Sequence, residues 1–225
     1  NIHLANSFLE VGETETAVAT ISGLTKFFLT QQTKIEQIIA GDLDPDDPMN
    51  RPHIRFNGTT LAENAEKWSH AQNDALGYYL WLTSRVIESG DFHVSADEMQ
   101  LLALFPRLLK ALRFWEDKDS GHWEESRKVE ASSIGTATRG LQAFDSLLDT
   151  AGELPGISTS TKESLVRETE EMISYGIQTL SKTLPWECRA DDPKERRRTD
   201  AALLFLIAPL GLLAPTDPQA MQIVE

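Results

Sequence analysis

The segment Leu76–Leu82 is apolar on nearly every face of a helix, with Gly77 as the exception. A helix that is apolar all round is stable only when other elements cover it on every side. This segment lies inside a helix that the spacing of apolar residues predicts over residues 71–88. The sequence therefore predicts a layered fold in which this helix belongs to the inner layer.

Apolar residues at helical spacing predict further helices over residues 14–40, 95–115, 134–148 and 160–182, and a short helix from about residue 200. Two Ser-x-x-Glu patterns, at residues 95–98 and 160–163, have the spacing of capping boxes. Pro106 is expected to kink or split its helix, and Ser132 and Ser133 are expected to cap the helix that follows them. No segment shows the two-residue alternation of a strand. We therefore expect an all-α fold of helical hairpins stacked in a ring or solenoid.

The chain carries 21 Lys and Arg residues against 35 Asp and Glu residues, a formal charge of −14. Such a surface repels phosphates, which argues against nucleic acid as a partner. The longest apolar stretch, residues 201–215, is too short to span a bilayer and contains two prolines, so we expect no membrane span. The single cysteine and the five histidines lack metal-ligand spacing, so we expect no metal site and no cofactor. The basic run at residues 194–198 is interleaved with acids and is interpreted as a solvated loop.

A long connection at residues 53–74 gathers hydrogen-bonding side chains and Trp68 just before the apolar helix. An aromatic ring among donors and acceptors is the composition of a sugar site, because the ring packs on C–H groups while the polar groups bind hydroxyls. The alternative is a structural loop, in which the Asn and Thr side chains satisfy the loop's own backbone and the Trp fills the core.

A second loop places Glu124 and Glu125 directly after Trp123, with Glu130 close behind. A Glu beside a Trp in a semi-apolar loop can have its pKa raised by desolvation, which is what a general acid requires. Inverting hydrolysis of a glycosidic bond needs two carboxylates about 6.5–9.5 Å apart, and two neighbouring residues with diverging side chains do not form such a pair. The alternative is that these acids flank a helix on an acidic protein.

Taken in order, the stretches 55–60, 68–75, 121–125 and 131–135 resemble glycoside hydrolase family 15. That family includes the glucoamylases and, as a divergent branch, the alpha and beta subunits of phosphorylase kinase. The resemblance is colinear over most of the chain and extends to Asp200–Leu204. It implies an (α/α)6 barrel of six helical hairpins, with the active site in the loops at one end. It also implies inverting hydrolysis of α-glucosidic bonds from the non-reducing ends of glucans or maltooligosaccharides.

The resemblance also implies a role for individual residues. Glu124 matches the general acid, Glu125 matches a second, sugar-binding acid, and Trp68 matches the tryptophan that lines the sugar pocket. The other substrate-binding residues that it implies are Arg55, Asn57, Gln72, Asp74 and Trp123. The family's catalytic base is a Glu in a later loop, beyond this sequence, and its early Trp/Arg/Asp motif would precede residue 1.

We therefore expect residues 1–225 to be a single domain, the central fragment of a glucoamylase-like barrel whose N- and C-terminal parts lie outside the sequence. A partial barrel would expose apolar inner helices such as Leu76–Leu82. The expected ligand is an α-glucan or oligosaccharide, and a protein partner or a homo-oligomer stays open. One cysteine and no visible targeting segment favour a cytoplasmic location.

Three functions remain at this point. The first is a glucoamylase-like hydrolase in which Glu124 protonates the departing oxygen and a carboxylate outside this sequence activates water. The second is a non-catalytic regulatory or scaffold subunit resembling the phosphorylase kinase alpha and beta subunits. The third is a helical interaction domain without a sugar site. Glu125 favours the enzyme, because the kinase branch tends to keep only the first acid of the pair.

Overall fold

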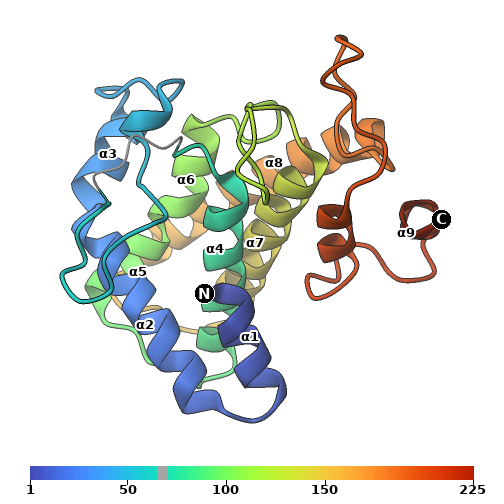
Figure 1. Ribbon diagram of the computed structural model, residues 1–225. Helices are drawn as coiled ribbons and strands as arrows, with labels where there is room; N and C mark the ends of the chain where they lie inside the picture. Colours follow the sequence, from blue (N-terminus) through green and yellow to red (C-terminus); the bar gives the residue numbers. More distant parts are fainter. Residues whose placement is uncertain (65–69) are drawn as a thin grey trace.

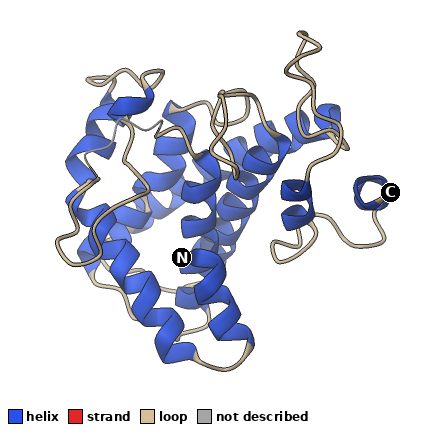
Figure 2. Ribbon diagram, in the orientation of Figure 1, coloured by secondary structure: helices blue, strands red, loops and turns tan. Residues whose placement is uncertain are grey.

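The computed structural model describes residues 1–64 and 70–225, and within these ranges its regular elements are all helical (Figures 1 and 2). The longer helices are α1 (Ile2–Glu10), α2 (Thr14–Thr30), α3 (Gln32–Ala40), α4 (Asn73–Glu88), α7 (Ala131–Thr150) and α8 (Thr159–Thr183). The shorter elements are α5 (Ala96–Leu102), α6 (Leu104–Ala111), α9 (Pro218–Val224) and the 3₁₀ turns η1 (Pro48–Asn50) and η2 (Ala201–Leu206). The prediction of an all-α fold is confirmed.

The helices form two layers, with α4 and α7 side by side in the middle of the molecule (Figure 1). On either side of this pair, α1 contacts α4 and η2 contacts α7. The outer helices α2 and α6 pack on α4, while α8 packs on α7 and on α6. This arrangement is consistent with the all-α toroid that the sequence implies.

The apolar segment of α4 is fully enclosed. Leu76 and Tyr78 are each 4% exposed, and the side chains of residues 79–82 are 0–1% exposed. The expectation that a partial barrel would expose this segment is therefore wrong. The reason is that α7 covers one face of α4 while α1, α2 and α6 cover the others.

Two glycines allow α4 and α7 to lie very close together. A Cβ atom on Gly77 would lie 2.6 Å from the backbone nitrogen of Ala137, and one on Gly140 would lie 2.5 Å from the carbonyl oxygen of Gly77. Both distances are shorter than real side chains tolerate, so only glycine fits. Because Gly77 and Ala137 each follow the start of their helix by a few residues, α4 and α7 begin at the same end of the molecule.

Several predicted helix boundaries need correction. The helix expected over residues 14–40 breaks at Gln31, next to Thr30, whose hydroxyl bonds the carbonyl of Phe27. The capping box at residues 95–98 is present, with its two bonds at 2.8 and 3.3 Å. The prediction of a capping box at residues 160–163 is wrong, because Ser158 caps α8 and residue 160 already lies in the first turn. The helix around Pro106 is split at Ala103, which leaves the proline in the first turn of α6, where it is tolerated.

Within the described residues, no helix combines the length and the apolar character needed to cross a membrane.

Candidate functional site

A cavity of about 410 Å³ opens at the end of the molecule where α4 and α7 begin. Its apolar wall includes the rings of Phe27, Phe28, Phe56 and Phe205. Its polar wall is formed by Gln72, Asp74, Tyr78, His122, Trp123 and Glu124. Four of the predicted site residues, from loops about fifty positions apart, therefore line one cavity: Gln72, Asp74, Trp123 and Glu124.

Glu124 reaches the wall of this cavity from a tight turn. Gly121 and Glu124 both adopt left-handed backbone conformations, with φ of 55° and 54°. The backbone N–H of Glu124 donates to the carbonyl of Gly121 at 3.2 Å, and that of Glu125 donates to Ser120 at 3.0 Å. A non-glycine residue at positive φ costs about 1 kcal/mol or more, a strain that is typical of functional sites. The turn separates the two neighbouring acids.

Glu124 forms an ion pair with Arg55 from the other predicted loop. The Nε of Arg55 lies 3.2 Å from Oε1 of Glu124, and its Nη2 contacts the second carboxylate oxygen. The side chains are 41% and 25% exposed, so the pair lies at the mouth of the cavity. Two predicted residues from separate loops are thus in direct contact.

Glu125 points to a different set of partners and is absent from the cavity wall. The Nζ of Lys128 lies 2.9 Å from its carboxylate, and Arg197 contacts the same oxygen. These two hydrogen bonds lower the pKa of Glu125 below its ordinary value, with Lys128 contributing most. Glu125 therefore stays ionised at neutral pH.

Asp200 fixes the ring of Trp123 beside the cavity. The indole Nε1 donates to Oδ1 of Asp200 at 2.7 Å, and Arg197 lies 2.7 Å from the second oxygen of the same carboxylate. Trp123 is 52% exposed, which leaves ring surface available at the cavity mouth. Arg197 and Asp200 are not among the site residues predicted from the sequence. Arg197 is not a solvated residue of the basic run, because it links Glu125 to Asp200.

Two side chains on the cavity wall have polar atoms that lack partners. Oδ1 of Asp74 and Oε1 of Gln72 find no hydrogen-bond partner within the described part of the chain. Burial raises the pKa of Asp74, although His122 opposes this effect. Buried polar atoms without partners are rare in proteins, so these two oxygens are candidates for binding ligand hydroxyls.

The remaining predicted residues are placed differently. Asn57 lies in an exposed turn, where its Oδ1 accepts the backbone N–H groups of Thr59 and Thr60 at 2.9 and 3.0 Å. Trp68 lies outside the described residues, and its place in the sugar pocket stays a prediction.

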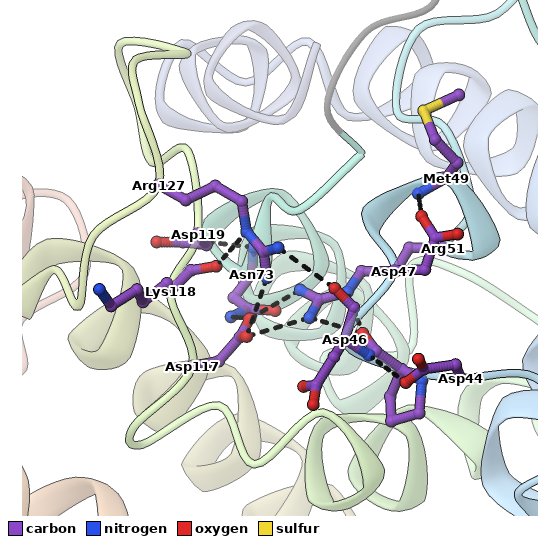
Figure 3. Close-up of polar contacts among 11 residues, drawn as sticks. Asp44, Asp46, Asp47, Met49, Arg51, Asn73, Asp117, Lys118, Asp119 and Arg127 are labelled. Carbon is purple, nitrogen blue, oxygen red and sulfur yellow. Dashed lines mark hydrogen bonds and ion pairs between the residues drawn. The ribbon is translucent and has the colours of Figure 1, made fainter.

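A buried ion pair holds the loops of the site together (Figure 3). Arg51 binds Asp117 through two hydrogen bonds of 2.6 and 3.0 Å, and both side chains are under 5% exposed. The side-chain amide of Asn73, the first residue of α4, donates to the same Asp117 at 2.8 Å. Its backbone N–H donates to Asp119 at 3.1 Å. The start of α4 is thereby tied to the loop that carries Trp123 and Glu124.

Within residues 1–64 and 70–225, no three His, Cys, Asp or Glu side chains come together as a group that could hold a metal ion.

Comparison with known proteins gives one family and two relatives. The family model described as "Glycosyl hydrolases family 15" matches residues 4–223. The "Probable phosphorylase b kinase regulatory subunit alpha" of Drosophila melanogaster is 26% identical over 141 residues, which cover 59% of this chain and 11% of that protein. The "Uncharacterized lipoprotein YgeQ" of Escherichia coli (strain K12) is 35% identical over 83 residues, covering 32% of this chain and 31% of that protein. The chain thus spans a third or less of each relative, and no solved structure matches it.

Proposed function

Since this chain belongs to the glycosyl hydrolases of family 15, we propose that it supplies the sugar-binding cavity and the general acid of a glucoamylase-like hydrolase. The reaction proposed is inverting hydrolysis of α-glucosidic bonds in glucans or maltooligosaccharides. The observation that carries the proposal is the meeting of Glu124, Trp123, Asp74 and Gln72 on the wall of one cavity.

Glu124 is the proposed proton donor to the departing glycosidic oxygen. Both of its oxygens contact Arg55. Ion pairs with this degree of exposure are worth about 0–1 kcal/mol. A sugar entering the cavity can therefore displace Arg55, and one oxygen of Glu124 then becomes available to the glycosidic oxygen.

The proposed sugar contacts follow from the chemistry of the wall. The exposed face of Trp123 packs on the C–H groups of a glucose ring. The unpartnered oxygens of Asp74 and Gln72 accept hydrogen bonds from its hydroxyls. As the resemblance to the family implies, we propose that Glu125, Arg55, Asn57 and Trp68 also bind the sugar, although Glu125 is turned from the cavity wall toward Lys128 and Arg197.

An inverting reaction also needs a carboxylate that activates water, about 6.5–9.5 Å from the acid. The two buried acids Glu130 and Glu187 are poor candidates, because neither lines the cavity that holds Glu124. We therefore propose that the base lies outside these residues, and that residues 1–225 form the central part of one barrel domain. We also propose that the protein is cytoplasmic and that it binds a protein partner or a second copy of itself.

The test is glucose release from maltotriose by the full-length protein. A general acid typically contributes about 10²- to 10⁴-fold to a rate, so Glu124→Gln is expected to lose activity by that factor. The first glucose released by the unmodified protein is expected to be the β-anomer. Glu116→Gln is the matched control, because that exposed acid lies outside the cavity and pairs with Arg113 at 3.2 Å. Undiminished glucose release by Glu124→Gln would overturn the assignment.

A second candidate is a non-catalytic regulatory or scaffold subunit. The similarity to the regulatory subunit from Drosophila melanogaster favours it. This function predicts no glucose release by the unmodified protein, together with retained oligosaccharide binding and a stable partner complex. The maltotriose experiment therefore distinguishes the two functions.

A further inference from the structure

A chain of close polar contacts runs from the cavity wall into the interior. The hydroxyl of Tyr78 lies 2.9 Å from Nε2 of His122, and Nδ1 of His122 lies 3.2 Å from the hydroxyl of Ser132. That hydroxyl lies 2.5 Å from Oε1 of Glu187. The four residues come from α4, the Glu124 loop, α7 and the loop before η2, so the chain links four segments.

Ser132 has a different role from the one expected. The prediction that Ser132 and Ser133 cap α7 is wrong, because the helix begins at Ala131 and both residues lie inside its first turn. The backbone N–H of Ser132 instead donates to Oε2 of Glu187 at 3.2 Å. Ser132 and Glu187 are 0% and 2% exposed, so this end of the chain is shielded from water.

The hydrogen bonds along this series of four residues can all be donated in either of two directions. Burial lowers the pKa of His122, so its ring is neutral and carries one N–H. When Glu187 is ionised, Ser132 donates to it, His122 donates to Ser132, and Tyr78 donates to His122. When Glu187 carries a proton, every donor and acceptor exchanges roles, and the O–H of Tyr78 becomes available to the neighbouring Thr136 hydroxyl or to a ligand hydroxyl in the cavity.

We propose that the hydroxyl of Tyr78 binds a hydroxyl group of the sugar in the cavity, and that Glu187, acting through Ser132 and His122, sets whether Tyr78 donates or accepts this hydrogen bond. The inference rests on the proposed function, because it names a further residue of the same sugar site. Tyr78 is a binding residue, whereas His122, Ser132 and Glu187 are positioning residues.

The surroundings favour the donating form of Tyr78 at neutral pH. Burial raises the pKa of Glu187 to about 8, and the carboxylates of Glu130 and Asp200 add to this effect. His122 faces Asp74 and Asp200, which oppose the effect of burial on its pKa, and the ring of His3 lies close to it. Glu187 therefore carries its proton below about pH 8, and the neutral phenol points its O–H at the ligand.

The test measures maltose binding by calorimetry in a Glu124→Gln background of the full-length protein, where the sugar is not consumed. Tyr78→Phe removes one neutral hydrogen bond and is expected to weaken binding about tenfold. The matched control is Tyr175→Phe, since the Tyr175 hydroxyl bonds Glu171 at 3.2 Å on α8, away from the cavity. This control is expected to bind maltose as the background protein does.

The pH dependence identifies the role of Glu187. In the background protein, maltose affinity is expected to change severalfold between about pH 6 and pH 9, with a midpoint near the Glu187 pKa of about 8. Glu187→Gln keeps the contact with Ser132 but cannot titrate, so it is expected to bind maltose with no such midpoint. The maltose affinity of Tyr78→Phe is expected to show no such midpoint either. Ser132→Ala interrupts the same series of hydrogen bonds at a second residue, with the same expected result.

Unchanged affinity in Tyr78→Phe, or a midpoint that survives in Glu187→Gln, would overturn this inference and leave the proposed function standing. A background protein that binds no maltose at any pH would overturn the proposed function as well.

Discussion

At the scale of single residues, the site is built on acids whose environments move their pKa values in opposite directions. Burial raises the pKa of Glu187 and Glu130 to about 8 and about 7. The pKa of Asp119 is also raised, by burial and by the nearby acids. The pKa of Glu125 is instead lowered by its hydrogen bonds to Lys128 and Arg197. Burial therefore favours the neutral form of Glu187 at neutral pH, whereas Glu125 stays ionised.

The raised pKa of Glu187 makes the folding stability fall with rising pH. Between about pH 4.5 and pH 8 the folded protein keeps this proton and the unfolded chain releases it, so the unfolded state is increasingly favoured. Glu187→Gln cannot titrate and is expected to become more stable relative to the unmodified protein, by a few kcal/mol, as the pH rises through this window. Urea denaturation at several pH values measures this difference. A difference in stability that stays constant with pH would show that Glu187 is ionised in the folded state.

The sequence predicts four residues of the cavity wall from two local motifs, and misses most of the side chains that pair across the chain. Glu124 follows Trp123 directly, and both line the cavity that Gln72 and Asp74 share. Arg197 contacts Glu125 across 72 positions, and Glu187 reaches Ser132 across 55. Such pairings depend on how distant segments pack, and the local pattern around the basic run indicates only a polar loop.

At the scale of elements, the position of the site depends on the contact between α4 and α7. Gly77 and Gly140 bring the two helix backbones together, and both helices begin beside the cavity. The link from Asn73 to Asp117 and Asp119 then fixes the Glu124 loop against the start of α4. A change in the spacing of the two helices is therefore expected to move the walls of the site.

Gly77→Ala tests this contact. The new Cβ would lie 2.6 Å from the Ala137 backbone nitrogen, so the helices must separate, and we expect a loss of about 2–3 kcal/mol in the free energy of unfolding. Gly23→Ala is the matched control, because Gly23 lies inside α2 and its Cβ would meet nothing within 4 Å. That substitution is expected to stabilise the protein by about 0.5–1 kcal/mol. Chemical denaturation of both variants gives the comparison, and equal effects would contradict a close helix contact.

The existence and type of α2, α4, α7 and α8 could be predicted from the sequence, whereas α1 and several helix ends could not. The apolar spacing around Leu76–Leu82 is strong enough to place an inner helix without other information. The start of α8 is less determined, because Ser158 and Ser160 are both good caps and only the preceding chain path selects the first. Pro106 similarly marks a break, but the break falls at Ala103.

At the scale of the whole molecule, the fold explains why two distant loops form one cavity. The loops precede α4 and α7, and these two helices lie side by side and begin at the same end. A hydrogen bond of 2.7 Å from the backbone of Ser120 to Ala71 joins the two loops directly. The family resemblance implies an active site in the loops at one end of the barrel, and the cavity opens among the loops at the end where α4 and α7 begin.

The central claim is that Glu124 supplies the proton to a departing sugar, and the dependence on the leaving group tests it most directly. Maltose needs a proton on its glycosidic oxygen, whereas α-glucosyl fluoride releases fluoride with little help from an acid. In the full-length protein, Glu124→Gln is expected to lose about 10²- to 10⁴-fold in kcat on maltose and to keep most of its rate on the fluoride. Equal losses on the two substrates, or no turnover of either by the unmodified protein, would contradict the account.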